Sequence, residues 1–288
     1  MRSEKASNTA RLIARSILLA SHDPRLRELV AEGESEITAR ILEETGGNLF
    51  SRLALYRIPR SLLLGLEGAM LPGIITHYLV RKRRIARAVR ESLASGMKRV
   101  VVIAAGYDSL CALLKNGFPE VDFIEIDHPA TQGAKRRALP ESHNFRYIAA
   151  DLSKESLSGH FPLDFSAVIV IEGLTMYLEE EAVSEIFQKL APACGTLVFT
   201  FMEKDENGSI AFRGQSPVVR AWLGKRGEPF LWGIARSELP SFLERCGFQC
   251  LEIIDDIQLR DEFVTSENLR NLPLARGECI CVAQPLER

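Results

Sequence analysis

The 288-residue sequence has little net charge, no Cys-x-x-Cys pair and no uninterrupted apolar run long enough to cross a membrane. Its formal charge of -2 argues against a dedicated nucleic-acid binder, because phosphate binding needs a concentrated positive face. The densest basic run, residues 81–84, reads mainly as a solvated helix face. With 46% apolar and 26% charged residues, the composition predicts an ordinary globular protein, either one large domain or a core with a helical cap.

The six cysteines are scattered along the chain and form no cluster with histidine of the kind that ligates metals, so we predict no metal site. Cys279 and Cys281 are two apart, and on a strand they would share a face as packing residues. No signal-peptide pattern is visible at the N-terminus, and reduced thiols in a cytoplasmic protein are the simplest expectation.

The most apolar stretch, residues 61–80, is a poor membrane span because charge, glycine and proline interrupt it. We expect it to line a pocket or to pack within a helical cap, and we expect no membrane partner. The interrupting residues are Gly65, Glu67, Gly68, Pro72 and Gly73.

Residues 8–95 read as helices with short breaks, which predicts a helical cap over residues 1–95. The first sign is Asp23-Pro24, a cap residue followed by the proline that suits a first turn. The predicted helices are one starting at Asp23-Pro24, one over residues 34–44 ended by Gly46-Gly47, and one over residues 76–93 closed by Ser95-Gly96.

From residue 99 short apolar runs alternate with helical stretches, which predicts an α/β fold with a doubly wound, mostly parallel sheet. No crossover helix precedes the last run, so we expect the last of the seven strands to be antiparallel. The predicted strands are 99–104, 121–126, 145–149, 166–171, 195–202, 248–254 and 278–284, and the predicted helices are 108–116, 130–138, 179–191 and 236–246. Residues 96–288 would form this Rossmann-like domain, with the glycine-rich segment 204–235 as a lid insertion.

A strand, a tight turn of small residues, a helix and a second strand ending in carboxylates follow one another in residues 99–127. An acid at the tip of the second strand is the usual means by which a doubly wound sheet holds a ribose diol. This segment therefore predicts a nucleoside-containing ligand.

Several segments, in order and spacing, resemble the class I S-adenosylmethionine-dependent methyltransferases of the leucine carboxyl methyltransferase type, whose bacterial branch acts mostly on small molecules. An Asp-Leu pair at residues 151–152 also stands where that family has one. The segments are Val-Ile-Ala-Ala-Gly-Tyr-Asp-Ser (102–109), Glu-Ile-Asp-His-Pro (125–129), Ile-Glu-Gly-Leu-Thr-Met-Tyr-Leu (171–178) and Gly-Glu-Pro-Phe (227–230) leading to Gly247-Phe248.

The resemblance implies a cofactor, S-adenosylmethionine, and a role for each matching residue. Asp127 would accept hydrogen bonds from both ribose hydroxyls, as a carboxylate readily does. Asp151 would accept from the adenine amino group, with Leu152 as an apolar wall. Glu172 would face the methionine ammonium, and Arg81, with Arg84 as the fallback, would bind the methionine carboxylate with its guanidinium fork.

The first turn departs from that family, which usually has Gly-x-Gly where this chain has Ala104-Ala105-Gly106. Gly106 permits close approach of the backbone to the ligand, so we place it in the cofactor site. Ala104 belongs there too, and its methyl group would press toward the ligand. Either the ligand sits slightly displaced or the turn absorbs the extra carbon.

Methyl transfer needs alignment and exclusion of water, and a general base matters more for a phenol or amine than for a carboxylate. We take Tyr177, His77 and Tyr78 as catalytic candidates and expect a structural role for His128 at a helix start. A sulfonium attracts aromatic faces, and the other aromatics considered for its surroundings are Tyr107, Trp222 and Trp232.

The sequence thus predicts an enzyme that methylates a small carboxylate, phenol or amine, as a monomer or homodimer. The alternative is a cyclase of the same ancestry that converts S-adenosylmethionine itself to azetidine-2-carboxylate and methylthioadenosine. Protein carboxyl methylation and a non-catalytic nucleoside-binding scaffold are further readings.

Overall fold

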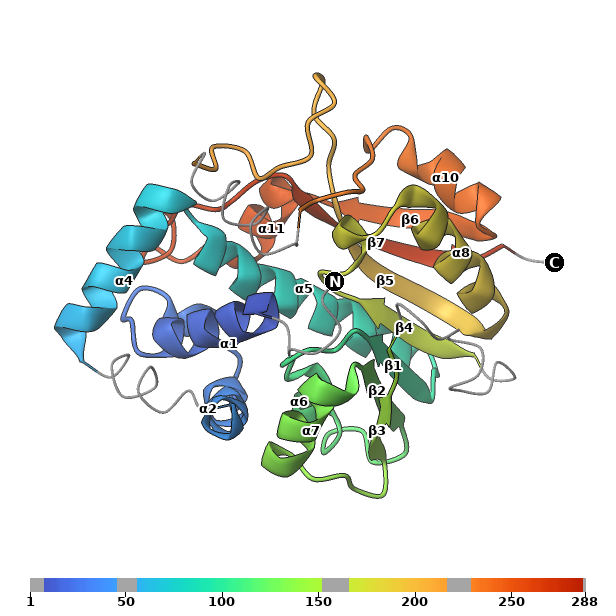
Figure 1. The fold of residues 1–288 in the computed structure, drawn as a ribbon, viewed down its shortest axis with the longest axis horizontal. Helices are drawn as coiled ribbons and strands as arrows, with labels where there is room; N and C mark the ends of the chain where they lie inside the picture. Colours follow the sequence, from blue (N-terminus) through green and yellow to red (C-terminus); the bar gives the residue numbers. More distant parts are fainter. Residues whose placement is uncertain (1–7, 46–55, 152–165, 217–228, 287–288) are drawn as a thin grey trace.

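The structure, a computed structural model, describes residues 8–45, 56–151, 166–216 and 229–286. Its centre is a seven-stranded sheet of order β3-β2-β1-β4-β5-β7-β6, with every strand parallel except β7 (Figure 1). The predicted doubly wound sheet and its antiparallel last strand are therefore confirmed. The strands are β1 (Arg99–Ile103), β2 (Asp122–Asp127), β3 (Phe145–Ala149), β4 (Ala167–Ile171), β5 (Cys194–Met202), β6 (Phe248–Ile254) and β7 (Glu278–Pro285).

Alternation along the strands divides the core into two layers, because successive side chains point to opposite faces. In β1, Val100 and Val102 face the layer that holds the N-terminal helices, whereas Val101 and Ile103 face the layer of α8 and α10. Cys279 and Cys281 belong to the second layer and are buried, which confirms them as packing residues.

The helices cover both faces of the sheet, and α4 lies at the edge of the molecule far from the strands (Figure 1). The long α5 shares its buried stripe with the first core layer, so the N-terminal helices pack directly on the sheet. The cap and domain boundaries at residues 95 and 96 remain predictions. The helices are α1 (Asn8–Ser21), α2 (Glu34–Glu44), α4 (Arg57–Met70), α5 (Ile74–Ala94), α6 (Leu110–Leu114), α7 (Pro129–Ala138), α8 (Glu180–Leu190), α10 (Leu239–Arg245) and α11 (Asp256–Phe263), with 3₁₀ turns η1 (Arg27–Leu29), η3 (Thr175–Tyr177) and η4 (Ala191–Ala193).

The helix predicted at Asp23-Pro24 is wrong, because the chain there makes turns and the single 3₁₀ helix η1. Asp23 accepts the N–H of Arg25 at 2.9 Å, which holds a local turn rather than a helix N-terminus. Leu26 and Leu29, three residues apart, are both buried, a spacing that suits a 3₁₀ turn. The predicted helix end at Gly46-Gly47 lies outside the described residues.

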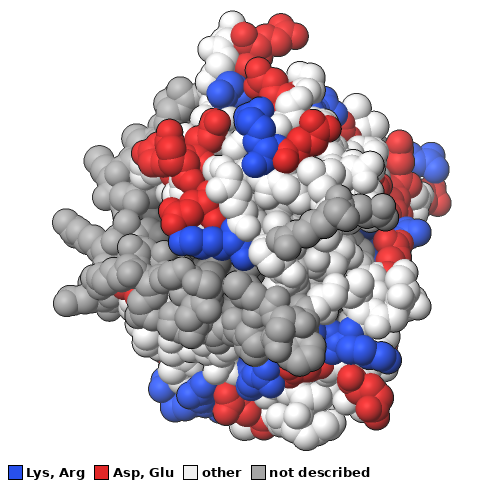
Figure 2. All heavy atoms as spheres, turned by 90° about the vertical axis from the view of Figure 1, so that its right-hand side faces the viewer, with Lys and Arg blue, Asp and Glu red and all other residues white. Residues whose placement is uncertain are grey.

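No described helix is by itself long and apolar enough to cross a bilayer, although Arg60–Met70 and Ile74–Ala94 pass that test of length and composition together, bent by 90°. On the described part of the face in Figure 2, basic side chains lie beside acidic ones, in keeping with the small net charge. Glu185 and Lys189 form such a pair within α8.

Candidate active site

A cavity of about 650 Å³ opens where β1 and β4 end side by side, the point at which the strand order changes direction. Ligands of open α/β sheets bind at this kind of switch point, outside the carboxyl ends of the strands. The wall includes the turn after β1, Asp127 at the end of β2 and Glu172 directly after β4. Helices α1, α4 and α5 close the other side.

The turn after β1 has an unusual backbone conformation. Ala104 has a φ of 55°, the left-handed region, and it is the only non-glycine residue with positive φ in the described chain. Gly106 follows with a φ of 52°, and a Cβ there would lie 3.0 Å from the Cβ of Ala10 in α1. Ala104 thus adopts a conformation typical of glycine, and because it carries a Cβ this conformation is strained.

Asp127 joins the two halves of the nucleoside-binding segment. One carboxylate oxygen accepts the N–H of Gly106 and the other accepts the N–H of His128. Burial raises the pKa of Asp127, although both hydrogen bonds act in the opposite direction. A carboxylate has about four lone-pair sites, so Asp127 retains acceptor capacity for the ribose hydroxyls that we predict it to bind.

The predicted adenine end is only partly described. Asp151 lies beside His128, with 3.9 Å between Oδ2 of Asp151 and Nε2 of His128. Asp151 is not among the described residues that line the cavity. Leu152 lies outside the described residues. His128 caps α7 by accepting the N–H of Ala130 at its Nδ1, 3.2 Å away, the structural role that the sequence predicts.

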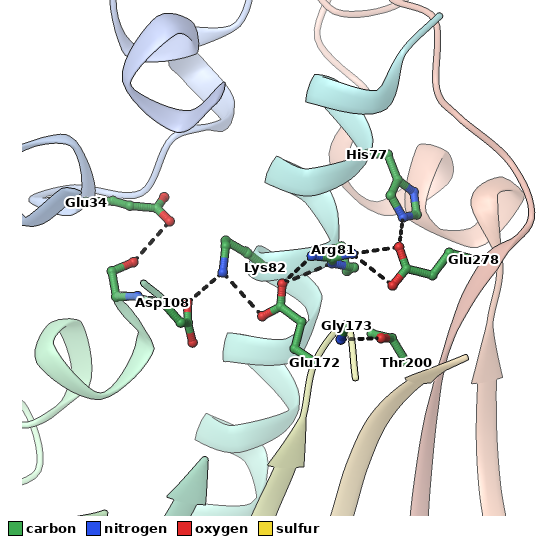
Figure 3. A network of polar contacts seen from close by, with 10 residues as sticks. Glu34, His77, Arg81, Lys82, Asp108, Glu172, Gly173, Thr200 and Glu278 are labelled. Atoms are coloured by element: carbon green, nitrogen blue, oxygen red, sulfur yellow. Dashed lines mark hydrogen bonds and ion pairs between the residues drawn. The ribbon is translucent and has the colours of Figure 1, made fainter. Parts of the chain in front are cut away.

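At the methionine end, the predicted residues are paired with one another (Figure 3). Arg81 donates through Nε and Nη2 to Oε1 of Glu172, at 3.0 and 2.6 Å. Lys82 bonds Asp108 at 2.6 Å and the other oxygen of Glu172 at 3.3 Å. Burial alone would lower the pKa of Lys82, but Asp108 and Glu172 raise it, so the ammonium stays charged.

Glu278 at the start of β7 completes this network, and the sequence reasoning missed it. Arg81 Nη1 donates to both of its carboxylate oxygens, at 2.8 and 2.6 Å, and His77 Nε2 lies 2.8 Å from Oε2. Burial alone would raise the pKa of Glu278, but Arg81 and His77 lower it to about 2. His77 is itself fully buried and is not among the described cavity-lining residues, and its Nε2 contacts Glu278.

The remaining wall of the cavity is largely apolar and aromatic. Both tyrosines predicted as catalytic line it, and the ring of Tyr177 lies 5.7 Å from that of Phe230 between centroids. Trp232, one of the aromatics considered for the sulfonium's surroundings, is instead buried against Phe242 in the opposite core layer as a packing residue. Trp222 lies outside the described residues. The helical side of the wall comes from Leu12, Ile13, Leu63, Leu66, Met70 and Ile74.

Helix α4 adds a carboxylate that the sequence reasoning treated only as a break in an apolar stretch. Glu67 lines the cavity, and its Oε1 accepts the N–H of Ile75 in the first turn of α5 at 3.4 Å. Burial raises the pKa of Glu67. The expectation that residues 61–80 line a pocket is confirmed, since both ends of this stretch contribute to the wall.

The residues present fit S-adenosylmethionine. A carboxylate beside a close-approach turn suits the ribose, and a facing pair of Glu172 and Arg81 offers one partner to an ammonium and one to a carboxylate. Among the described residues, no group of three or more His, Cys, Asp or Glu side chains is placed to hold a metal ion.

Comparison with known proteins places the chain among methyltransferases. Residues 21–191 match the family model of leucine carboxyl methyltransferase. The tetracenomycin polyketide synthesis O-methyltransferase TcmP of Streptomyces glaucescens is 29% identical over 136 residues, 47% of this chain and 48% of that protein. The putative S-adenosyl-L-methionine-dependent methyltransferase YktD of Bacillus subtilis (strain 168) is 21% identical over 201 residues, 65% of this chain and 66% of that protein.

The matches thus span less than two thirds of either relative. Among solved structures, the mitomycin 7-O-methyltransferase MmcR superposes with a TM-score of 0.47 at 14% identity, covering 94% of this chain and 74% of that one. The family model covers more than half of the chain and both halves of the nucleoside-binding segment. The chain therefore belongs to the leucine carboxyl methyltransferase family, whose cofactor is S-adenosylmethionine.

Proposed function

We propose that this protein transfers the methyl group of S-adenosylmethionine to an oxygen atom of a predominantly apolar small molecule. The observation that carries the proposal is a single cavity with two unlike halves. One half holds the strand-end carboxylates and the close-approach turn, and the other is walled by aliphatic and aromatic side chains from the helices. The relative TcmP, named as an O-methyltransferase of polyketide synthesis, supports the acceptor class.

When bound, the cofactor supplies an electrophilic methyl group for an in-line displacement. The chain's own contribution is to hold both reactants in line and to keep water away. Asp127 would fix the ribose, and Arg81 with Glu172 would fix the amino-acid end. Leu63 and Leu66 on α4 would cover the acceptor and exclude water.

Two ionisable groups of the cavity wall, Tyr78 and Glu67, would have different roles toward an acceptor. Burial raises the pKa of Tyr78, so its phenol stays protonated near neutral pH and would donate a hydrogen bond to a ligand rather than act as a base. Glu67 would accept the proton of a phenol. Burial raises the pKa of its carboxyl group, which brings that pKa closer to the range useful for general-base catalysis. An acceptor that is already a carboxylate would need no base. Tyr177 would contact the acceptor or the sulfonium.

Product analysis tests the proposal. The purified protein is incubated with S-adenosylmethionine, with and without a panel of aromatic carboxylic acids, phenols and amines, and the nucleoside product is identified by mass. We expect S-adenosylhomocysteine only when an oxygen acceptor is present, with Asp127→Ala as the impaired control. Acceptor-free formation of methylthioadenosine and azetidine-2-carboxylate would instead establish the cyclase alternative. Cofactor binding without any turnover would establish a scaffold.

A further inference from the structure

Arg81 is held from two opposite sides in the buried network (Figure 3). Its Nε and Nη2 face Glu172 on one side and its Nη1 faces Glu278 on the other, and both carboxylates belong to the cavity wall. A guanidinium has five N–H donors, and all three of its nitrogens donate to these two carboxylates, in four contacts. The Nε–Nη2 edge, which faces Glu172, offers the pair of parallel donors that suits a planar carboxylate.

Glu278 is the partner that a ligand would leave in place. It lies at the start of β7 with 1% exposure, and His77 Nε2 lies 2.8 Å from its Oε2, an oxygen that Arg81 also bonds. Both carboxylates line the cavity, but the side chain of Glu172, directly after β4, is 10% exposed against 1% for Glu278, and Lys82 bonds the oxygen that Arg81 does not use. An amino acid's ammonium and carboxylate can therefore replace the contact between Arg81 and Glu172, each end taking one of the two partners.

Burial makes a permanent counter-charge for Arg81 necessary. Its guanidinium is 2% exposed, and a buried charge deprived of its partner is strongly unfavourable. If Glu172 turned toward an ammonium, Glu278 would still compensate Arg81. Two cations, Arg81 and Lys82, then face three carboxylates, the third being Asp108, and this balance suits a ligand that carries an additional positive sulfonium.

We infer that Glu278, itself held by His77, is a positioning residue that orients Arg81 so that its Nε–Nη2 edge binds the carboxylate of the cofactor's amino-acid end. The inference rests on the proposed function, since it assumes that S-adenosylmethionine occupies this cavity. Glu278 lies 197 residues from Arg81 in the chain and outside the stretch matched by the family model.

Two nucleoside probes separate positioning from a general structural role. S-adenosylhomocysteine carries the amino-acid end, whereas methylthioadenosine has the same adenosine and thioether but lacks that end. Binding of both to the wild-type protein and to Glu278→Gln is measured by calorimetry. We expect Glu278→Gln to weaken S-adenosylhomocysteine about tenfold or more, the effect of a misplaced charge-assisted contact, and to leave methylthioadenosine within about twofold.

Glu125→Gln is the matched control, because Glu125 is another buried carboxylate paired with a cation, Lys135, at 2.6 Å, on the neighbouring strand β2. It should change the affinities for both probes by the same factor. Glu278→Asp, which keeps the charge, should recover part of the S-adenosylhomocysteine affinity. If Glu278→Gln does not fold, His77→Asn provides the same comparison with a smaller selective loss.

Equal weakening of both probes by Glu278→Gln, or no weakening of either, would overturn the inference and leave the proposed function intact. A wild-type protein that binds neither probe would overturn the proposed function and this inference with it.

Discussion

Replacing Ala104 with glycine should stabilise the protein, contrary to the usual effect of glycine in a folded chain. Ala104 adopts a φ of 55° directly after β1, and this left-handed conformation is less favourable for an L-residue than for glycine. The left-handed conformation is unfavourable for alanine by about 1–2 kcal/mol. Glycine in turn gives the unfolded chain about 0.4–1 kcal/mol of additional conformational entropy.

The difference predicts that Ala104→Gly raises the free energy of unfolding by about 0.5–1 kcal/mol. For a chain of this size, that corresponds to a rise in Tm of about 1–4 °C. Ala105→Gly is the matched control, because Ala105 is a neighbouring alanine whose φ is not positive. That variant gains the same unfolded-state entropy without relieving strain and also loses a buried methyl group, so its stability should fall by at least about 0.4–1 kcal/mol.

Urea denaturation and thermal melting, both without ligand, measure the two variants against the wild-type protein. A fall in the stability of Ala104→Gly as large as that of Ala105→Gly would refute the assignment of strain to this turn. The same variants report on the cavity, since the Ala104 methyl group lies in its wall. We expect Ala104→Gly to bind S-adenosylhomocysteine at least as tightly as the wild-type protein.

Three further predictions follow from the site. Gly106→Ala should destabilise the fold by about 1–2 kcal/mol in urea, because the new Cβ meets α1 at 3.0 Å and the φ of 52° is strained; unchanged stability would contradict that packing. Thr200→Val should cost about 1–3 kcal/mol of stability, since Thr200 Oγ1 accepts the N–H of Gly173 at 2.9 Å, whereas a neutral substitution would show that this bond is dispensable. Glu278, with a pKa of about 2 in the folded state against an ordinary 4.5, should contribute stability that is complete above about pH 4.5 and lost as the pH falls toward 2. The gap in urea midpoint between the wild-type protein and Glu278→Gln should therefore narrow from pH 6 to pH 3, and a constant gap would argue against the pairing.

The sheet could be predicted from the sequence because its signals are local. Each predicted strand lies within one residue of the observed strand at both ends, and α2 has the predicted bounds. The positions of Asp127 and Glu172 in the cavity wall could also be predicted, since a residue at the carboxyl end of a parallel strand must lie near the ligand crevice. The helix predicted over residues 76–93 lies within α5.

The ion pairs within the site could not be predicted from the sequence, because they join segments far apart in the chain. Nothing local indicates that Glu278 on β7 meets Arg81 on α5, or that His77 turns away from the cavity. The buried position of Trp232 likewise depends on how the chain returns to the second core layer after residue 228. Periodicity could not distinguish the turn at Asp23 from a helix start, since both begin with a side-chain acceptor followed by proline.

The central claim is that this cavity binds S-adenosylmethionine through Asp127. Calorimetric titration of S-adenosylhomocysteine into the wild-type protein and into Asp127→Ala tests it most directly. We predict one binding site in the wild-type protein and an affinity weakened by about 1–3 kcal/mol in the variant, through loss of charge-assisted hydrogen bonds to the ribose. Absence of binding by the wild-type protein, or the same affinity in both proteins, would contradict the claim.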